Sequence, residues 1–187
     1  MPFVDVSPTD WHFEYVRYMY CRNVVVGYSN NPPCEAGSPC FKPNNSTTRG
    51  QVSKIVTLAF QFTLNTTDGP HFTDVPVTNT FYPYVETMVN MGIVEGYDDG
   101  TFRPNNLVTR GQISKMVVNA AINADPQNWS LENPAASTFE DVPVGSTFYQ
   151  FIETAVSHGV IVGYPCGQPP SGACQPGNKP YFMPYSN

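Results

Sequence analysis

Apolar side chains recur at helical spacing in three stretches of the chain. In each stretch the positions i, i+3 and i+4 are apolar, which places them on one face of a helix. They are Val16, Met19 and Tyr20; Val85, Met88 and Val89; and Ile152, Ala155 and Val156. We expect the three helices to stop at Asn23, Gly92 and Gly159, because glycine, and to a lesser degree asparagine, accepts the left-handed conformation that closes a helix.

Two further helices are predicted to begin in the segments TTRGQ (47–51) and VTRGQ (108–112). Each segment has a threonine three residues before a glutamine, which is the spacing of a capping box. The pairs are Thr48 with Gln51, and Thr109 with Gln112. An apolar stripe follows each pair; it consists of Val52, Ile55, Val56 and Ala59 in one helix, and of Ile113, Met116, Val117 and Ala120 in the other.

The same order of motifs occurs three times, so the chain is a tandem repeat. FVDV, FTDV and FEDV begin at positions 3, 72 and 139, and VVVGY, IVEGY and VIVGY begin at 24, 93 and 160. One helix-loop-helix unit cannot bury its apolar face alone, so the repeats are expected to pack on one another around a shared core. The aspartates of the first motif, Asp5, Asp74 and Asp141, are interpreted as caps of the segments that follow them.

Composition and charge narrow the classes of partner. Of the 187 residues, 19 are proline and only 13% are charged, which predicts short helices joined by stiff loops. The net charge is −6, and the nine lysines and arginines are scattered singly, so no basic stripe exists for nucleic acid or for an anionic membrane. No apolar run approaches the roughly 18 residues that membrane insertion needs.

The five cysteines indicate an oxidising compartment. Cys34 and Cys40 flank one loop-like segment, and Cys166 and Cys174 flank another, so two short disulfides are the favoured interpretation. A single zinc site built from all four is the alternative, although the spacings are wider than those usual in structural zinc sites. Cys21 is left over, either as a free thiol or as a competitor for a partner in the nearby loop.

The repeated motifs resemble the S-layer homology (SLH) repeat of bacterial cell-surface proteins. The resemblance is carried by FxDV, by GYDDGTFRP at 96–104 and by TRGQ, and it covers nearly the whole chain. It implies a mainly α fold in which three helix-loop-helix repeats with long Pro/Gly-rich loops pack around a pseudo-threefold axis. Residues 1–187 would form one module, with repeats at 3–66, 72–125 and, incomplete, 139–187.

The resemblance also implies a function and candidate site residues. SLH modules are extracellular and not enzymatic, need no cofactor, and hold cell-wall polysaccharide, often acidic and pyruvylated, in grooves between repeats. The arginine of the family motif falls on Arg49 and Arg110, whose guanidinium groups suit a carboxylate, and the family tryptophan falls on Trp11. The alternatives are that the arginines tie helices together and that Trp11 is a core residue. The final acid of the family motif is glutamine here.

The loops after the second motif differ between repeats. Repeats 1 and 3 carry insertions that contain the cysteine pairs, and such insertions are often contact surfaces. Repeat 2 keeps a short loop in which Asp98 and Asp99 are better read as an Asp-Gly turn than as a calcium site.

The third copy of the TRGQ helix is absent from the sequence. Counted from Phe182, its arginine would fall at position 190, beyond Asn187. Either the sequence is cut short, or the mature chain ends there and leaves an apolar socket for a neighbouring subunit. The first reading favours an anchoring module; the second favours a self-assembling subunit of an S-layer or an extracellular filament.

An enzyme is the third class considered. His12, His71 and His158 fall at unrelated positions of the repeat, and the chain has neither an HExxH nor a GxSxG motif. We therefore expect no catalytic residues, no metal ligands and no cofactor.

Overall fold

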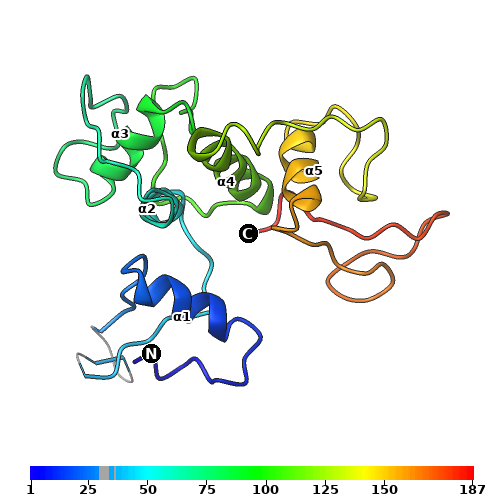
Figure 1. Ribbon diagram of the computed structural model, residues 1–187, viewed down its shortest axis with the longest axis horizontal. Coiled ribbons are helices and arrows are strands. Elements are labelled where there is room, and N and C mark those ends of the chain that lie inside the picture. Colours follow the sequence, from blue (N-terminus) through cyan, green and yellow to red (C-terminus); the bar gives the residue numbers. More distant parts are fainter. Residues whose placement is uncertain (30–33, 36) are drawn as a thin grey trace.

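The computed structural model describes residues 1–29, 34–35 and 37–187. It contains five helices: α1 (Phe13–Cys21), α2 (Arg49–Ala59), α3 (Tyr82–Asn90), α4 (Arg110–Ala124) and α5 (Tyr149–Ser157). The described part of the chain holds only isolated β-bridges beside these helices, so the prediction of a mainly α fold is confirmed (Figure 1). None of the five helices combines the length and the apolarity that crossing a membrane requires.

The first helix of each repeat stops where the sequence predicts. Asn23, Gly92 and Gly159 all have positive φ values, of 57°, 66° and 67°. The next residue in each case donates its amide back into the last turn, as Val24 does to the Met19 carbonyl at 2.9 Å and Ile93 to the Met88 carbonyl at 2.8 Å. This Schellman pattern satisfies carbonyls that the end of a helix would otherwise leave unpaired.

The second helices begin with a capping box. In α2 the Gln51 amide donates to the Thr48 hydroxyl, and the Thr48 amide donates to Gln51 Oε1 at 2.9 Å. Thr109 and Gln112 make the same pair of bonds at the start of α4. By contrast, α1, α3 and α5 have no side-chain hydrogen bond at their N-caps.

Each second helix packs on the first helix of the next repeat. α2 packs on α3, α4 packs on α5, and α2 also contacts α4, whereas α1 belongs to none of these pairs. In Figure 1, α1 accordingly lies apart from the other four helices. Close approach depends on glycine, because a Cβ at Gly50 would collide with the Phe81 ring and one at Gly111 with the Phe148 ring. The predicted pseudo-threefold arrangement stays a prediction.

The next repeat also caps each second helix. The Arg49 and Gly50 amides, which have no partner within α2, donate to the carbonyls of Asn106 and Pro104, both at 2.9 Å. The first two amides of α4 likewise donate to the carbonyls of Ser186 and Pro184, both at 2.8 Å. These bonds lock successive repeats together at fixed register.

Among the described residues, the apolar core is divided into three clusters rather than one. The central cluster includes Val52 of α2, Val85 and Met88 of α3, and Met116 of α4, so it joins repeats 1 and 2. A smaller cluster forms around Phe139 and Ile152 in repeat 3, and another around Phe3 and Val16 in repeat 1. The expectation of one shared core was therefore too simple: none of the described helices covers α1 and connects its cluster to the rest.

The sequence suggested that the repeated aspartates cap the segments that follow them. This prediction was wrong. Each carboxylate instead accepts two backbone amides of the loop that follows the second motif of the same repeat, 28 to 42 residues further along the chain. Asp74, for example, accepts from Phe102 and Arg103 at 2.8 and 2.7 Å. Asp5 and Asp141 do the same with residues 41–42 and 182–183. A carboxylate can bridge two amides wherever the fold brings them, so sequence distance did not constrain the pairing.

Both short disulfides are confirmed. Cys34 pairs with Cys40, and Cys166 with Cys174, with Cα–Cα distances of 5.1 and 4.8 Å. The zinc alternative was wrong, because the four sulfurs that it required are consumed in these bonds. Cys21 is an exposed free thiol at the end of α1.

Candidate functional site

Two grooves with matching walls lie at the junctions between repeats. The first groove, about 350 Å³, is lined by Tyr28, Gln51 and Lys54 of repeat 1 together with Phe81 of repeat 2. The second groove, about 280 Å³, is lined by the equivalent residues of repeats 2 and 3, which are Tyr97, Gln112, Lys115 and Phe148. The match follows from the packing of each second helix on the next repeat.

In the first groove the positive side chains have no ion-pair partner among the described residues. The Lys42 ammonium lies 4.8 Å from the centre of the Tyr28 ring, and the Lys54 ammonium lies 5.6 Å from that of Tyr84. The Tyr28 hydroxyl accepts a hydrogen bond from Gln51 Nε2 at 2.9 Å. Lys42 and Lys54 both line this groove and are half-buried.

In repeat 2 the equivalent cations are paired. Lys115 Nζ lies 3.0 Å from Glu95 Oε2, and both residues line the second groove. Arg103, the equivalent of Lys42, does not line the groove; its Nη2 lies 2.9 Å from Asp99 Oδ2. Hydrogen bonds from Thr101 and then from Arg103 lower the pKa of Asp99 to about 2, so this carboxylate is charged at neutral pH. Gln112 Nε2 approaches the Tyr97 hydroxyl at 3.5 Å, more loosely than in the first groove.

Arg49 and Arg110 each tie a second helix to the following repeat. Arg49 is 7% exposed; its Nε donates to the Phe102 carbonyl at 3.0 Å and its Nη2 to the Glu95 carbonyl at 3.1 Å. Arg110 makes the same bonds to Phe182 and Val162 at 2.8 and 3.2 Å. Burial lowers the pKa of Arg49, but a guanidinium stays protonated in proteins. Arg49 still lines the second groove.

Trp11 lies outside both grooves. Its side chain is 85% exposed just before α1, and its nearest aromatic neighbour is His12, with ring centres 5.3 Å apart. The structure therefore does not bring Trp11 together with Arg49 or Arg110. Its equivalent in repeat 3, Thr147, does line the second groove.

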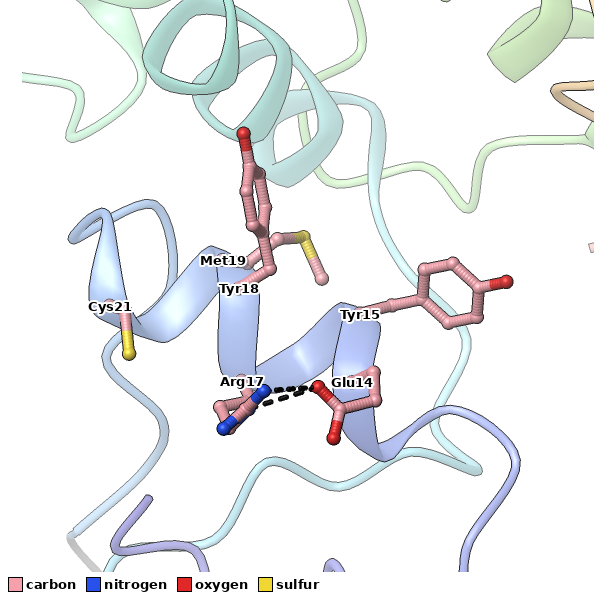
Figure 2. A pocket seen from close by; sticks show the side chains of 6 residues that line it. All are labelled: Glu14, Tyr15, Arg17, Tyr18, Met19 and Cys21. Atoms are coloured by element: carbon pink, nitrogen blue, oxygen red, sulfur yellow. Dashed lines mark hydrogen bonds and ion pairs between the residues drawn. The ribbon is translucent and has the colours of Figure 1, made fainter.

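The surface of α1 carries a further depression, of about 570 Å³, lined by residues of this helix alone. Figure 2 shows Tyr15 and Tyr18 projecting away from the helix, and Glu14 paired with Arg17, whose Nε lies 3.0 Å from Glu14 Oε2. Tyr15 and Tyr18 are 67% and 59% exposed. Because one helix supplies every wall, this surface is open rather than enclosed.

The lysines and tyrosines of the grooves were missed as site residues at the sequence level. Their signal was present, since Lys54 and Lys115 stand three residues after the capping glutamines in both copies. Tyr28 and Tyr97 likewise end the second repeated motif. In the described part of the chain, no group of three or more histidines, cysteines, aspartates or glutamates is arranged to hold a metal ion.

The family model of the S-layer homology domain matches residues 2–53 and 71–113, which together are half of the chain. The chain belongs to the S-layer homology domain family. The matched segments run from the first motif to the start of the second helix in repeats 1 and 2. Together with the two disulfides, this membership indicates a module of the extracellular cell surface, as expected.

Three relatives show how small a part of a larger protein this chain resembles. An endoglucanase of Bacillus sp. (strain KSM-635) is 33% identical over 64% of the chain and 12% of its own length. Cell surface glycoprotein 1 of Acetivibrio thermocellus is 26% identical over 68% of the chain and 6% of its own length. The surface-layer 125 kDa protein of Lysinibacillus sphaericus is 29% identical over 66% of the chain and 10% of its own length. The chain therefore spans about a tenth of these relatives.

Proposed function

We propose that the chain anchors to the cell envelope by binding surface polysaccharide in the two inter-repeat grooves. One observation carries the proposal: the same four kinds of side chain line both grooves at equivalent positions of the repeat. Packing alone does not require a tyrosine hydroxyl, an amide and an ammonium to converge on open space twice. A site with an aromatic wall and a few convergent polar groups is the usual form of a small-molecule or saccharide pocket.

The groove chemistry suits a sugar chain. Phe81 and Phe148 offer apolar faces for sugar rings, whereas Gln51 and Gln112 offer amides for hydroxyl groups. Lys54 and Lys115 offer ammonium groups that can donate hydrogen bonds to the oxygen atoms of a saccharide. Arg49 and Arg110 contribute mainly by holding the walls in place, since their donors are directed at backbone carbonyls. This role is non-catalytic.

The unit of function that we propose is a single module of three repeats, at 3–66, 72–125 and 139–187. Repeat 3 supports this division because Asp141 binds the amides of Phe182 and Met183 as its counterparts do in repeats 1 and 2. It supplies Phe148 to the second groove, so that groove needs it. Truncation after residue 125 would remove one groove wall.

Sedimentation with purified cell wall of the source bacterium tests the proposal. The chain should pellet with intact wall, and should stay in the supernatant with wall whose polysaccharide has been chemically removed. The double variant Lys54→Met with Lys115→Met should lose most of the binding, and Lys179→Met, outside both grooves, should retain it. Equal pelleting with stripped wall would sink the proposal.

The exposed face of α1 favours a second candidate function, self-assembly into an S-layer or filament. The same face is covered by α2 in repeat 2 and by α4 in repeat 3, but in repeat 1 no described helix covers it. A neighbouring subunit could cover Trp11, Tyr15 and Tyr18. Light scattering of the protein alone should then show growth in size that Tyr15→Ser with Tyr18→Ser abolishes; a monomer at all concentrations would exclude this role.

A further inference from the structure

The two grooves share a wall plan but differ in charge. The position of Glu95, which pairs with Lys115, is occupied in repeat 1 by Val26, which is 67% exposed and lines the first groove. No acidic side chain is among the residues that line the first groove. The difference comes from one residue at an equivalent position, in VVVGY against IVEGY.

The cation beside the tyrosine of each repeat differs in the same way, although only Lys42, and not Arg103, lines a groove. Lys42 and Arg103 both follow the loop phenylalanine, and both stack on the tyrosine of their repeat, at 4.8 and 3.9 Å. Arg103 is held by Asp99, which belongs to the short loop of repeat 2. For Lys42 no ion pair occurs among the described residues.

We infer that the first groove is the anion-selective site of the module, with Lys54 as its specificity-determining residue, and that Glu95 makes the second groove selective for uncharged saccharide. The inference rests on the proposed function and deepens it. The ligand of the first groove would be a saccharide unit that carries a carboxylate.

The physical reason is competition for the same cation. A carboxylate 3.0 Å from Lys115 already satisfies the ammonium, so an incoming anion must displace it or meet its repulsion. Lys54 has no ion-pair partner among the described residues, and its ammonium lies 5.6 Å from the centre of the Tyr84 ring, so an anion displaces no carboxylate there. Arg49 adds positive charge to the second groove, but two of its nitrogens donate to carbonyls and its side chain is buried. Arg49 therefore has little freedom to bind an anion in place of Lys115.

Groove-resolved titration by NMR tests the inference. The backbone amides of Gly27 and Gly96 report on the first and second grooves, and the probes are sodium pyruvate, a pyruvylated methyl glycoside and the same glycoside without pyruvate. Both pyruvate-bearing probes should move the Gly27 amide at roughly tenfold lower concentration than the Gly96 amide. The difference should shrink as salt rises, because these charges face solvent. Equal responses of the two amides would overturn the inference.

Exchanging two exposed residues provides the matched test. Val26→Glu should weaken anion binding at the first groove about tenfold, and Glu95→Val should strengthen it at the second by a similar factor. Lys54→Met should abolish the preference, and Lys179→Met should leave it intact. An exchange without effect on either amide would contradict the inference even if wall binding persists. Conversely, anion selectivity without wall binding would overturn the proposed function and leave the charge asymmetry standing.

Discussion

α1 and α3 occupy the same place in consecutive repeats and share the same apolar stripe, yet they are buried very differently. α3 buries Val85, Glu86, Thr87 and Met88, whereas α1 buries only Val16. The difference arises because α2 covers α3, whereas α1 is in none of the packed helix pairs of the described residues. The comparison teaches that the first helix of a repeat is buried mainly by the second helix of the preceding repeat.

The largest effect should come from truncating the methionine that the two helices share. Met88 is fully buried in the central cluster and Met19 is only half-buried. Met88→Ala should lower the free energy of unfolding by about 2–5 kcal/mol, since it leaves a cavity, and Met19→Ala by about 1 kcal/mol or less. Urea unfolding of both variants measures this. Equal losses would show that α1 is as well covered as α3.

The second-largest effect on stability should come from Arg49, which ties α2 to repeat 2. Arg49→Lys removes the planar group that reaches two carbonyls at once, and should cost about 2 kcal/mol of unfolding free energy. Arg22→Lys is the control, because Arg22 is exposed and only stacks on Tyr18. Thermal or urea unfolding measures both. A stable Arg49→Lys variant that has lost wall binding would instead make Arg49 a ligand-binding residue.

A third test uses equivalent positions of opposite charge. The buried Glu86 accepts from the His71 amide at 3.1 Å and contacts His71 Nδ1 at 2.5 Å, so it holds the segment that enters repeat 2. Glu86→Gln should cost about 1 kcal/mol, because one of these partners loses its acceptor. Arg17→Gln, at the equivalent exposed position of α1, should change stability by about 0.5 kcal/mol or less. Chemical unfolding of the Glu86→Gln and Arg17→Gln variants measures both changes in stability. A larger loss for Arg17→Gln would contradict the comparison.

The smallest effect concerns the loop that follows α3. The pKa of Asp99 is lowered to about 2 by Thr101 and Arg103. A lowered folded-state pKa means that the stabilising contribution is complete above the unfolded value, about 3.9, and is lost as pH falls from there toward 2. Carboxyl-carbon NMR should show Asp99 titrating near 2 in the native protein and closer to 3.9 after Arg103→Gln with Thr101→Val, which removes both side-chain partners and leaves the bond from the amide of residue 101. A native titration midpoint near 3.9 would show that Thr101 and Arg103 do not lower the pKa of Asp99.

Local features of this fold could be predicted from the sequence because they involve neighbouring residues. The stops at Asn23, Gly92 and Gly159 depend on one residue's own φ, and the Thr48–Gln51 spacing fixes a bond within a single turn. The disulfides also lie within short loops. Each of these predictions needed no knowledge of the tertiary arrangement.

Features that depend on tertiary packing could not be predicted in the same way. The apolar stripe of α2 did not reveal that α2 would cover α3 of the next repeat and leave α1 bare. The loop amides bound by Asp74 are distant in sequence, and the burial of Glu86 follows from the path of the entering segment. The grooves depend on the same packing, although the recurring lysines, and the exchange of Val26 for Glu95, were visible as a pattern.

Asp5, Asp74 and Asp141 each hold one loop of their own repeat through two backbone amides, and this has a practical consequence. Each loop is closed at its base by backbone bonds as well, since Tyr97 donates to Thr101, and Tyr28 and Tyr164 pair with Cys40 and Tyr181. Each loop is thus held by backbone hydrogen bonds at its base and by one aspartate carboxylate that recurs in all three repeats. Neither interaction depends on the length of the loop. Foreign peptides grafted in place of Asp98 and Asp99 should therefore leave these bonds intact, whereas Gly100 should be kept because its carbonyl accepts the Thr73 amide at 3.1 Å.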